Sequence, residues 1–125
     1  MEKLKFINDQ MDRIGVPYEF GEWTSENKDL YFVGEITEEP TETEDGLEQS
    51  TMLLTGFTRG KYSDLAQAKE KIQNHFPAFY GKRGQTDSGS SIAVFFDGCF
   101  YVPTGEADLK KIQINLKIKE WKGDM

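Results

Sequence analysis

The sequence predicts an α+β fold: an antiparallel or mixed β-sheet with two helices packed on one face and a long acidic β-hairpin arm. Three observations lead to this prediction. Two segments repeat apolar residues at helical spacing, several shorter runs have the alternation or continuity of strands, and one polar stretch between two such runs holds acids and no base. The 125 residues are enough for one core but not for two, so residues 1–125 are expected to form a single domain.

A first helix is expected close to the N-terminus, where it should cover the sheet. Gly15 and Pro17 end it. The following segment, 16–23, alternates but contains this proline, so it suits an edge strand with Tyr18 and Phe20 facing inward. The apolar residues of the helix recur at spacings of three and four, which places them on one face: Leu4, Ile7, Met11 and Ile14.

Two strands are expected at 31–36 and 51–58, joined by an acidic arm at 37–50. No Lys or Arg occurs between Lys28 and Arg59. Because its carboxylates have no counter-charge in the segment, the arm cannot be buried and is expected to project into water or toward a partner. These carboxylates belong to Glu38, Glu39, Glu42, Glu44, Asp45 and Glu48.

A second helix is expected next, with Ser63 as its N-cap, Asp64 at the positive end of the helix dipole and Pro77 as its end. Its apolar stripe consists of Leu65, Ala68, Ile72 and Phe76. The segment 78–90 has no periodicity and is rich in glycine and polar residues, which predicts a flexible loop. The alternative is a segment that becomes ordered on contact with a neighbouring subunit.

The C-terminal third predicts a hairpin and a final strand. The dipeptide Asp97-Gly98 tolerates positive φ at both central turn positions, so it predicts a tight hairpin between strands at 92–96 and 99–102. Residues 112–119 alternate strictly between apolar and polar, which is typical of a strand with one buried and one solvated face.

The charge balance argues against a nucleic-acid groove, because the net charge is −7 and such grooves are basic. Lysines nevertheless crowd the last strand region. We interpret them as a solvated strand face, with nucleic-acid binding as the weaker alternative. They are Lys110, Lys111, Lys117, Lys119 and Lys122. The single cysteine makes no internal disulfide, and neither a signal peptide nor a membrane span is evident, so a cytoplasmic protein without a membrane partner is expected.

No residue pattern predicts catalysis, a metal site or a cofactor. His75 is the only histidine and has no oriented partner in the sequence, so a surface or capping role is favoured. Cys99 lies among aromatic residues, which favours a core position over a nucleophile. The carboxylates of the arm lack the ligand spacing of a calcium loop, and the glycines around Lys82 and Arg83 do not match a phosphate-binding loop. We therefore predict a protein without enzymatic activity.

Residues 31–76 are similar to the small tail terminator, or tail completion, proteins of long-tailed bacteriophages and prophages. The similarity lies in Tyr31-Phe32-Val33-Gly34-Glu35-Ile36, in the arm at 39–50, and in Gly56-Phe57-Thr58-Arg59-Gly60 leading into Ser63-Asp64-Leu65. The order of elements also resembles that family over most of the chain. This resemblance implies a structural protein that forms a ring, typically a hexamer, which caps the tail tube and faces the head connector.

The resemblance also implies the partners and the location. The partners are further copies of the chain, the tail-tube protein and the head connector or neck protein, while DNA passes through the ring without specific binding. The protein is then cytoplasmic in the bacterial host and later part of the virion tail. Within the ring, Lys82 and Arg83 are hypothesised to contact a neighbouring subunit or the tube. Four acids are hypothesised to face the lumen, where they repel phosphate, or a neighbouring subunit: Glu42, Glu44, Asp45 and Glu48.

Two other classes of protein share the small size and the acidity. One is a different neck or head-completion protein of a phage. The other is an acidic binding inhibitor, such as an immunity protein or a DNA mimic, which needs carboxylates on rigid elements at phosphate-like spacing. The acids of this chain crowd into a turn-rich segment, which argues against the rigid mimic.

Overall fold

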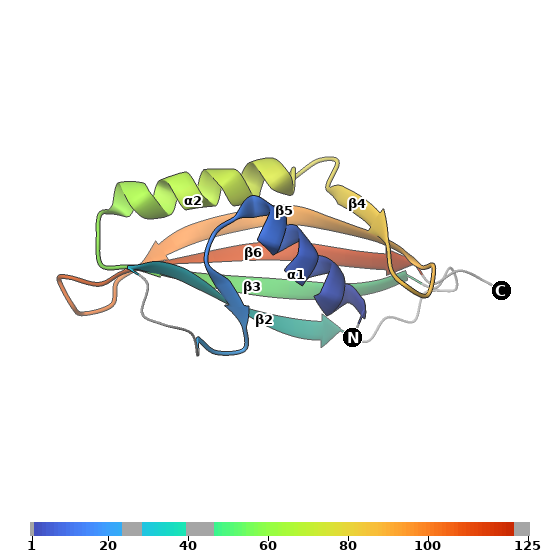
Figure 1. The fold of residues 1–125 in the computed structure, drawn as a ribbon, viewed down its shortest axis with the longest axis horizontal. Helices are drawn as coiled ribbons and strands as arrows, with labels where there is room; N and C mark the ends of the chain where they lie inside the picture. The colour runs from blue at the N-terminus through green and yellow to red at the C-terminus, as the bar shows by residue number, and fades with distance from the viewer. Residues whose placement is uncertain (1, 24–28, 40–46, 122–125) are drawn as a thin grey trace.

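The computed structural model describes residues 2–23, 29–39 and 47–121, and these form two helices and a six-stranded sheet (Figure 1). The helices are α1 (Glu2–Ile14) and α2 (Tyr62–His75). The strands are β1 (Tyr18–Phe20), β2 (Leu30–Glu39), β3 (Leu47–Thr58), β4 (Lys82–Gln85), β5 (Ser91–Val102) and β6 (Lys110–Trp121). The predicted α+β class is confirmed.

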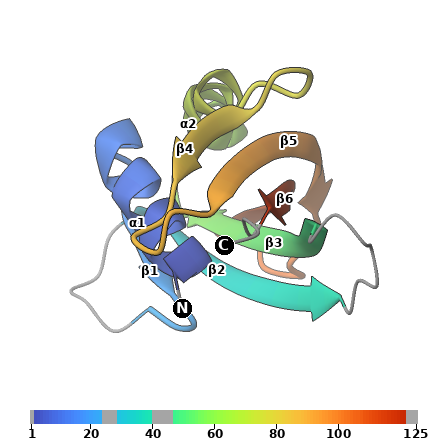
Figure 2. The same cartoon turned by 90° about the vertical axis from the view of Figure 1, so that its right-hand side faces the viewer.

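The sheet is mixed and curled. Its strand order is β1-β2-β3-β6-β5-β4, in which β1 runs parallel to β2 and every other neighbouring pair is antiparallel. Figure 2 shows the curl of the sheet from its end. The three strands at its centre, β3, β6 and β5, have 12 residues each, whereas the edge strands β1 and β4 have 3 and 4. The mixed sheet of the prediction is therefore present, with its only parallel pair at one edge of the described strands.

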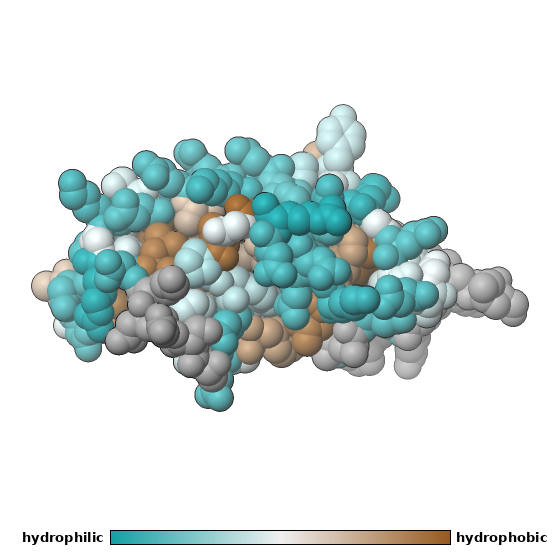
Figure 3. Space-filling model, in the orientation of Figure 1, coloured by the Kyte–Doolittle hydropathy of each residue, from teal (hydrophilic) through white to brown (hydrophobic). Residues whose placement is uncertain are grey.

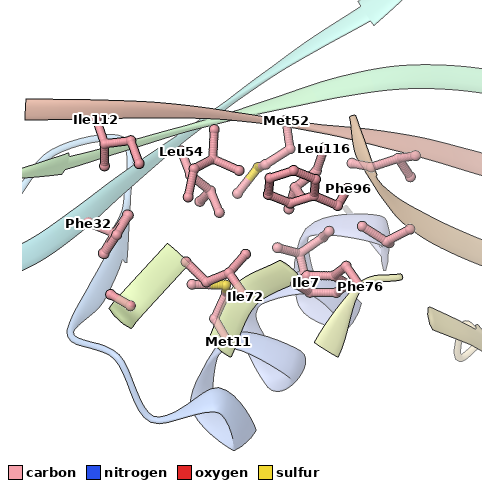
Figure 4. Close-up of a cluster of buried hydrophobic side chains, with 14 of the residues drawn as sticks. Ile7, Met11, Phe32, Met52, Leu54, Ile72, Phe76, Phe96, Ile112 and Leu116 are labelled. Carbon is pink, nitrogen blue, oxygen red and sulfur yellow. The ribbon is translucent and has the colours of Figure 1, made fainter. Parts of the chain in front are cut away.

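One apolar core joins the helices to the sheet (Figure 4). Helix α1 contributes Ile7 and Met11, and helix α2 contributes Leu65, Ala68 and Ile72. The predicted alternation of the last strand is confirmed, because four side chains of β6 have no exposed surface and the residues between them are half-buried. The four are Ile112, Ile114, Leu116 and Ile118. The central strand of the sheet thus has one face toward the core and one face away from it.

The Asp97-Gly98 dipeptide does not form the predicted hairpin. Strand β5 continues through it, and the register with β6 shifts by one residue between Phe96 and Cys99, which is a β-bulge. Gly98 has a φ of +123°, a conformation that favours glycine. The bulge explains why Phe96 and Cys99, three residues apart, both lie on the core side of the strand. The backbone freedom of this dipeptide suits a tight turn, but in this chain it allows a bulge.

Three further local expectations are corrected. Within 78–90, residues Lys82–Gln85 are not a loop but the edge strand β4, which pairs with β5. Helix α2 is preceded by Lys61 rather than capped by Ser63; the Asp64 carboxylate accepts a hydrogen bond from the Lys61 backbone N–H at 3.0 Å. Phe20 is 38% exposed at the end of β1, so it is not packed into the core as Tyr18 is.

The described ends of the acidic arm are strand. Strands β2 and β3 remain paired as far as Glu39 opposite Gln49, so Glu38 and Glu48 belong to the sheet. The remaining acids of the arm, Glu42, Glu44 and Asp45, lie outside the described residues.

Candidate docking surface

The face of β6 that points away from the core is polar and basic. Its residues alternate with the four buried ones and are each half-buried: Lys111, Gln113, Asn115, Lys117 and Lys119. Because β6 lies between β3 and β5, this row runs along the middle of the sheet. The outward positions of β3 and β6 carry no acid. On β2, which β3 separates from β6, the outward acid with a described side chain is Glu35. A chain with a net charge of −7 thus has a basic stripe on its central strand.

Strand pairing brings Arg83 into this basic stripe. Lys119 is opposite Ala93 of β5, and Ala93 is opposite Arg83 of β4, so the cations lie in one row across the sheet. Lys117 occupies the next row, two residues along the strand from Lys119. The Nζ of Lys119 lies 5.6 Å from the centre of the Phe95 ring, a cation–π contact that holds its stem against the sheet.

A hollow of about 640 Å³ lies at the same end of the sheet. Four of its lining residues occupy outward positions in the strand register: Arg83, Gln85, Ser91 and Trp121. We call this hollow, together with the neighbouring Lys117 and Lys119, the basic hollow. It combines an aromatic side chain, short polar groups and three cations, a combination that suits an acidic segment of a partner.

The cations of the basic hollow are not neutralised within the described part of the chain. The ion pairs there join Lys3 to Glu38, Lys5 to Asp87 and Arg59 to Asp108. Arg83 instead donates from Nε to the backbone carbonyl of Tyr80 at 3.2 Å.

The opposite end of the same face is aromatic. The rings of Trp23, Tyr31 and Phe57 stack in sequence, with centroids 4.9 and 5.2 Å apart. Lys111 lies over the last ring, 5.7 Å from its centre. Because these rings already contact one another and Lys111 covers the last of them, the basic hollow is the stronger docking candidate.

A second hollow, of about 480 Å³, lies where α1 ends and α2 begins. Figure 3 views the molecule from the side on which α1 lies, and shows hydrophilic side chains with apolar ones between them. Two of the four charged groups that line this hollow have partners: Arg59 pairs with Asp108 at 3.1 Å, and Asp64 accepts the hydrogen bond at the start of α2. The other two, Asp29 and Lys71, are opposite in charge. It therefore offers less to a charged ligand than the basic hollow does.

A buried polar network ties α1 and the loop after β4 to the core side of the sheet. Ser90 Oγ donates to Glu120 Oε2 at 2.7 Å and shares a hydrogen bond with Thr86 at 2.5 Å. Thr86 contacts Ser88 at 3.2 Å, and Ser88 donates to Glu2 at 2.6 Å, which lowers the pKa of the Glu2 carboxyl. The network thus links the exposed Glu2 carboxylate to the buried Glu120 carboxylate through three hydroxyls. It stabilises the loop, but it does not pair a nucleophile with a general base.

Replacing Ser90 by alanine is expected to lower the free energy of unfolding by about 1–2 kcal/mol. The substitution removes the hydroxyl that donates a hydrogen bond to the carboxylate of Glu120, a residue that is only 5% exposed. Ser91→Ala is the matched control, since the adjacent Ser91 is exposed, and a change within about 0.5 kcal/mol is expected there. Urea denaturation followed by circular dichroism measures both. Equal effects of the two variants would show that the network does not contribute to stability.

The structure separates the two basic residues that the sequence grouped together. Lys82 is opposite Val94, which belongs to the core cluster, and so lies on the core side of β4, whereas Arg83 is opposite Ala93 in the outward row of Lys119. Of the predicted acids, Glu48 is half-buried on β3, directly opposite Glu120 of β6. The sequence shows that lysines cluster in β6. Their alignment with Arg83 and Trp121 depends on strand pairing, which no local sequence pattern predicts.

The single histidine and the single cysteine have structural surroundings. His75 Nε2 lies 2.7 Å from Gln10 Oε1, and burial together with Lys82 and Arg13 lowers the pKa of its ring. Cys99 is half-buried against the core. Across the described ranges, no group of three or more His, Cys, Asp or Glu side chains is placed to hold a metal ion.

No protein-family model matches the chain, and no curated protein shows significant similarity to it. Neither helix of the described chain is long and apolar enough to cross a bilayer.

Proposed function

We propose that this chain is a structural assembly protein of a long-tailed phage or prophage that caps the tail tube and forms the tail side of the head–tail junction. It acts as a homo-oligomer, a hexameric ring, and has no catalytic activity. Both helices pack on one face of the sheet in this assembly, and the acidic segment 37–50 forms an arm. The ring contacts the tail-tube protein and the head connector, and DNA passes through it without specific binding.

The observation that carries this proposal is the basic hollow on the outward face of the sheet. It provides Arg83, Lys117 and Lys119 beside Trp121, with no ion pair to an acid of the described chain. Such a surface suits contact with another protein better than chemistry on a small molecule. The resemblance of residues 31–76 to tail terminators supports the same class of function.

Negative-stain electron microscopy of the protein mixed with tail tubes tests the proposal. The expected result is ring-shaped density at one end of each tube. Binding along the sides of the tubes, or no binding, would contradict it. A parallel pull-down with purified tube protein and purified connector protein distinguishes a tail cap from a different neck or head-completion protein, because the latter is expected to retain the connector alone.

A further inference from the structure

We propose that the basic hollow binds the acidic segment 38–48 of a second copy of this chain. The inference rests on the self-association included in the proposed function, but not on the tail tube. It assigns the hypothesised acids to contact with a neighbouring subunit rather than to a ring lumen.

The charges of the hollow favour an anionic occupant. Lys117 and Lys119 point to the same side of one strand, and Arg83 lies in the row of Lys119. Three like charges on one surface repel each other weakly through water, and a carboxylate placed between them attracts all three. The cation–π contact of Lys119 and the carbonyl contact of Arg83 orient these groups but do not neutralise them. An acidic chain laid along the outward face relieves the repulsion.

This chain itself contains such an anion. Between Lys28 and Arg59 it has no base, and six acids fall within 38–48. Glu38 pairs with Lys3 and Glu48 lies on the core side of β3, so the other four are the acids assigned to the hollow. A nucleic acid is the less favoured occupant, because a phosphate backbone is bound by an extended row of cations, whereas the hollow offers three. A peptide segment with carboxylates needs only the local cations and can place a side chain against Trp121.

On the Arg83 side of the hollow the occupant comes from a second copy, because the segment of the same copy is too short to lie along β4. At a strand spacing of about 4.8 Å, β4 lies about 19 Å from β2 and about 14 Å from β3. The chain from Glu39 to Leu47 spans at most about 28 Å when fully extended. Its backbone can approach Lys119 but cannot cross β4 and return. The Arg83 side of the hollow is therefore open to a neighbour.

Sedimentation equilibrium of reciprocal charge variants tests this inference. Lys117→Glu with Lys119→Glu, and separately Glu42→Lys with Glu44→Lys, are each expected to weaken self-association at least about tenfold. Mixing the two variants is expected to restore association, because the reversed face and the reversed segment are again complementary. High salt is expected to weaken the wild-type assembly.

Two controls separate charge from folding. Lys61→Glu with Lys71→Glu makes the same charge change at exposed positions next to or on α2 and is expected to leave association unchanged. Lys117→Gln with Lys119→Gln removes the charges without adding acids to the sheet, and it is expected to weaken association while the circular dichroism spectrum stays that of the wild type.

Three results would overturn the inference. The first is a wild-type protein that stays monomeric at all concentrations; a ring on tail tubes in the microscope would then still support the proposed function, so the two failures are distinguishable. The second is a mixture of the charge variants that does not recover association. The third is a Lys117 and Lys119 variant that loses affinity for single-stranded DNA while its self-association is unchanged, which would make the hollow a nucleic-acid surface.

Discussion

Replacing Phe32 by alanine is expected to lower the free energy of unfolding by about 3–5 kcal/mol. The Phe32 side chain has no exposed surface and projects from β2 into the core shared by both helices. Removing a buried ring loses its transfer free energy and leaves a cavity that long paired strands cannot collapse to fill. Since single domains are stable by about 5–15 kcal/mol, this one change removes a large part of the total.

Guanidinium denaturation of the wild type and of two further variants measures the effect of Phe32. Phe79→Ala is the matched control, because Phe79 is 83% exposed and its removal is expected to change the stability by less than about 0.5 kcal/mol. Phe32→Leu keeps most of the volume and is expected to cost about 1–2 kcal/mol, so a folded reference exists if the alanine variant does not fold. Similar losses for Phe32→Ala and Phe79→Ala would contradict the assigned core.

The sequence revealed those elements whose side chains repeat with a clear period. Strand β6 was predictable because its apolar residues alternate without interruption from Ile112 to Ile118. Helix α1 was predictable because Ile7 and Met11 lie on one helical face, and the structure buries both. In these segments the local pattern and the tertiary environment agree.

The incorrect predictions occur where a local signal fits two structures. Asp97-Gly98 supplies backbone freedom that serves a hairpin turn or a bulge, and the choice depends on β6, which pairs with both halves of β5. Strand β4 has only four residues, and its Gly84 lies where a Cβ would contact the Phe6 ring of α1 at 2.5 Å. Neither fact can be inferred without the fold, because each depends on a partner far away in the sequence.

The candidate site follows the same rule. The lysines of β6 were visible as a cluster, but a solvated strand face and a docking surface have the same sequence pattern. Their relation to Arg83 depends on two successive strand pairings, through Ala93, and the hollow beside Trp121 depends on the short edge strand. Local periodicity predicts which side of a strand is polar, whereas it does not predict which polar sides of different strands meet.

Replacing Gly56 by alanine is expected to lower the free energy of unfolding by about 3 kcal/mol, the upper end for an overpacked core position. Gly56 lies on β3 directly between Phe32 of β2 and Ile112 of β6. An added Cβ would lie 2.6 Å from Phe32 Cζ and 2.9 Å from Ile112 Cγ2. Both neighbours are fully buried, so neither can retreat without disturbing the strands that carry it.

Gly56 and the Phe32 ring pack against each other: the ring occupies the space beside Gly56 that a side chain would otherwise fill. Gly34→Ala is the comparison, because its Cβ would meet the ends of two side chains: Met52 Cε at 2.5 Å, which is flexible, and the ring edge and hydroxyl of the half-buried Tyr18 at 2.9 Å. That variant is expected to lose only about 1 kcal/mol.

A double-mutant cycle tests whether the ring is the obstacle at Gly56. In the Phe32→Leu background the smaller side chain leaves room for the new methyl group, so Gly56→Ala is expected to cost at least about 1 kcal/mol less than it does in the wild type. Chemical denaturation with unchanged m-values measures all four proteins. Additive losses would mean that the cost of Gly56→Ala comes from the strand backbone or from Ile112 and not from the Phe32 ring.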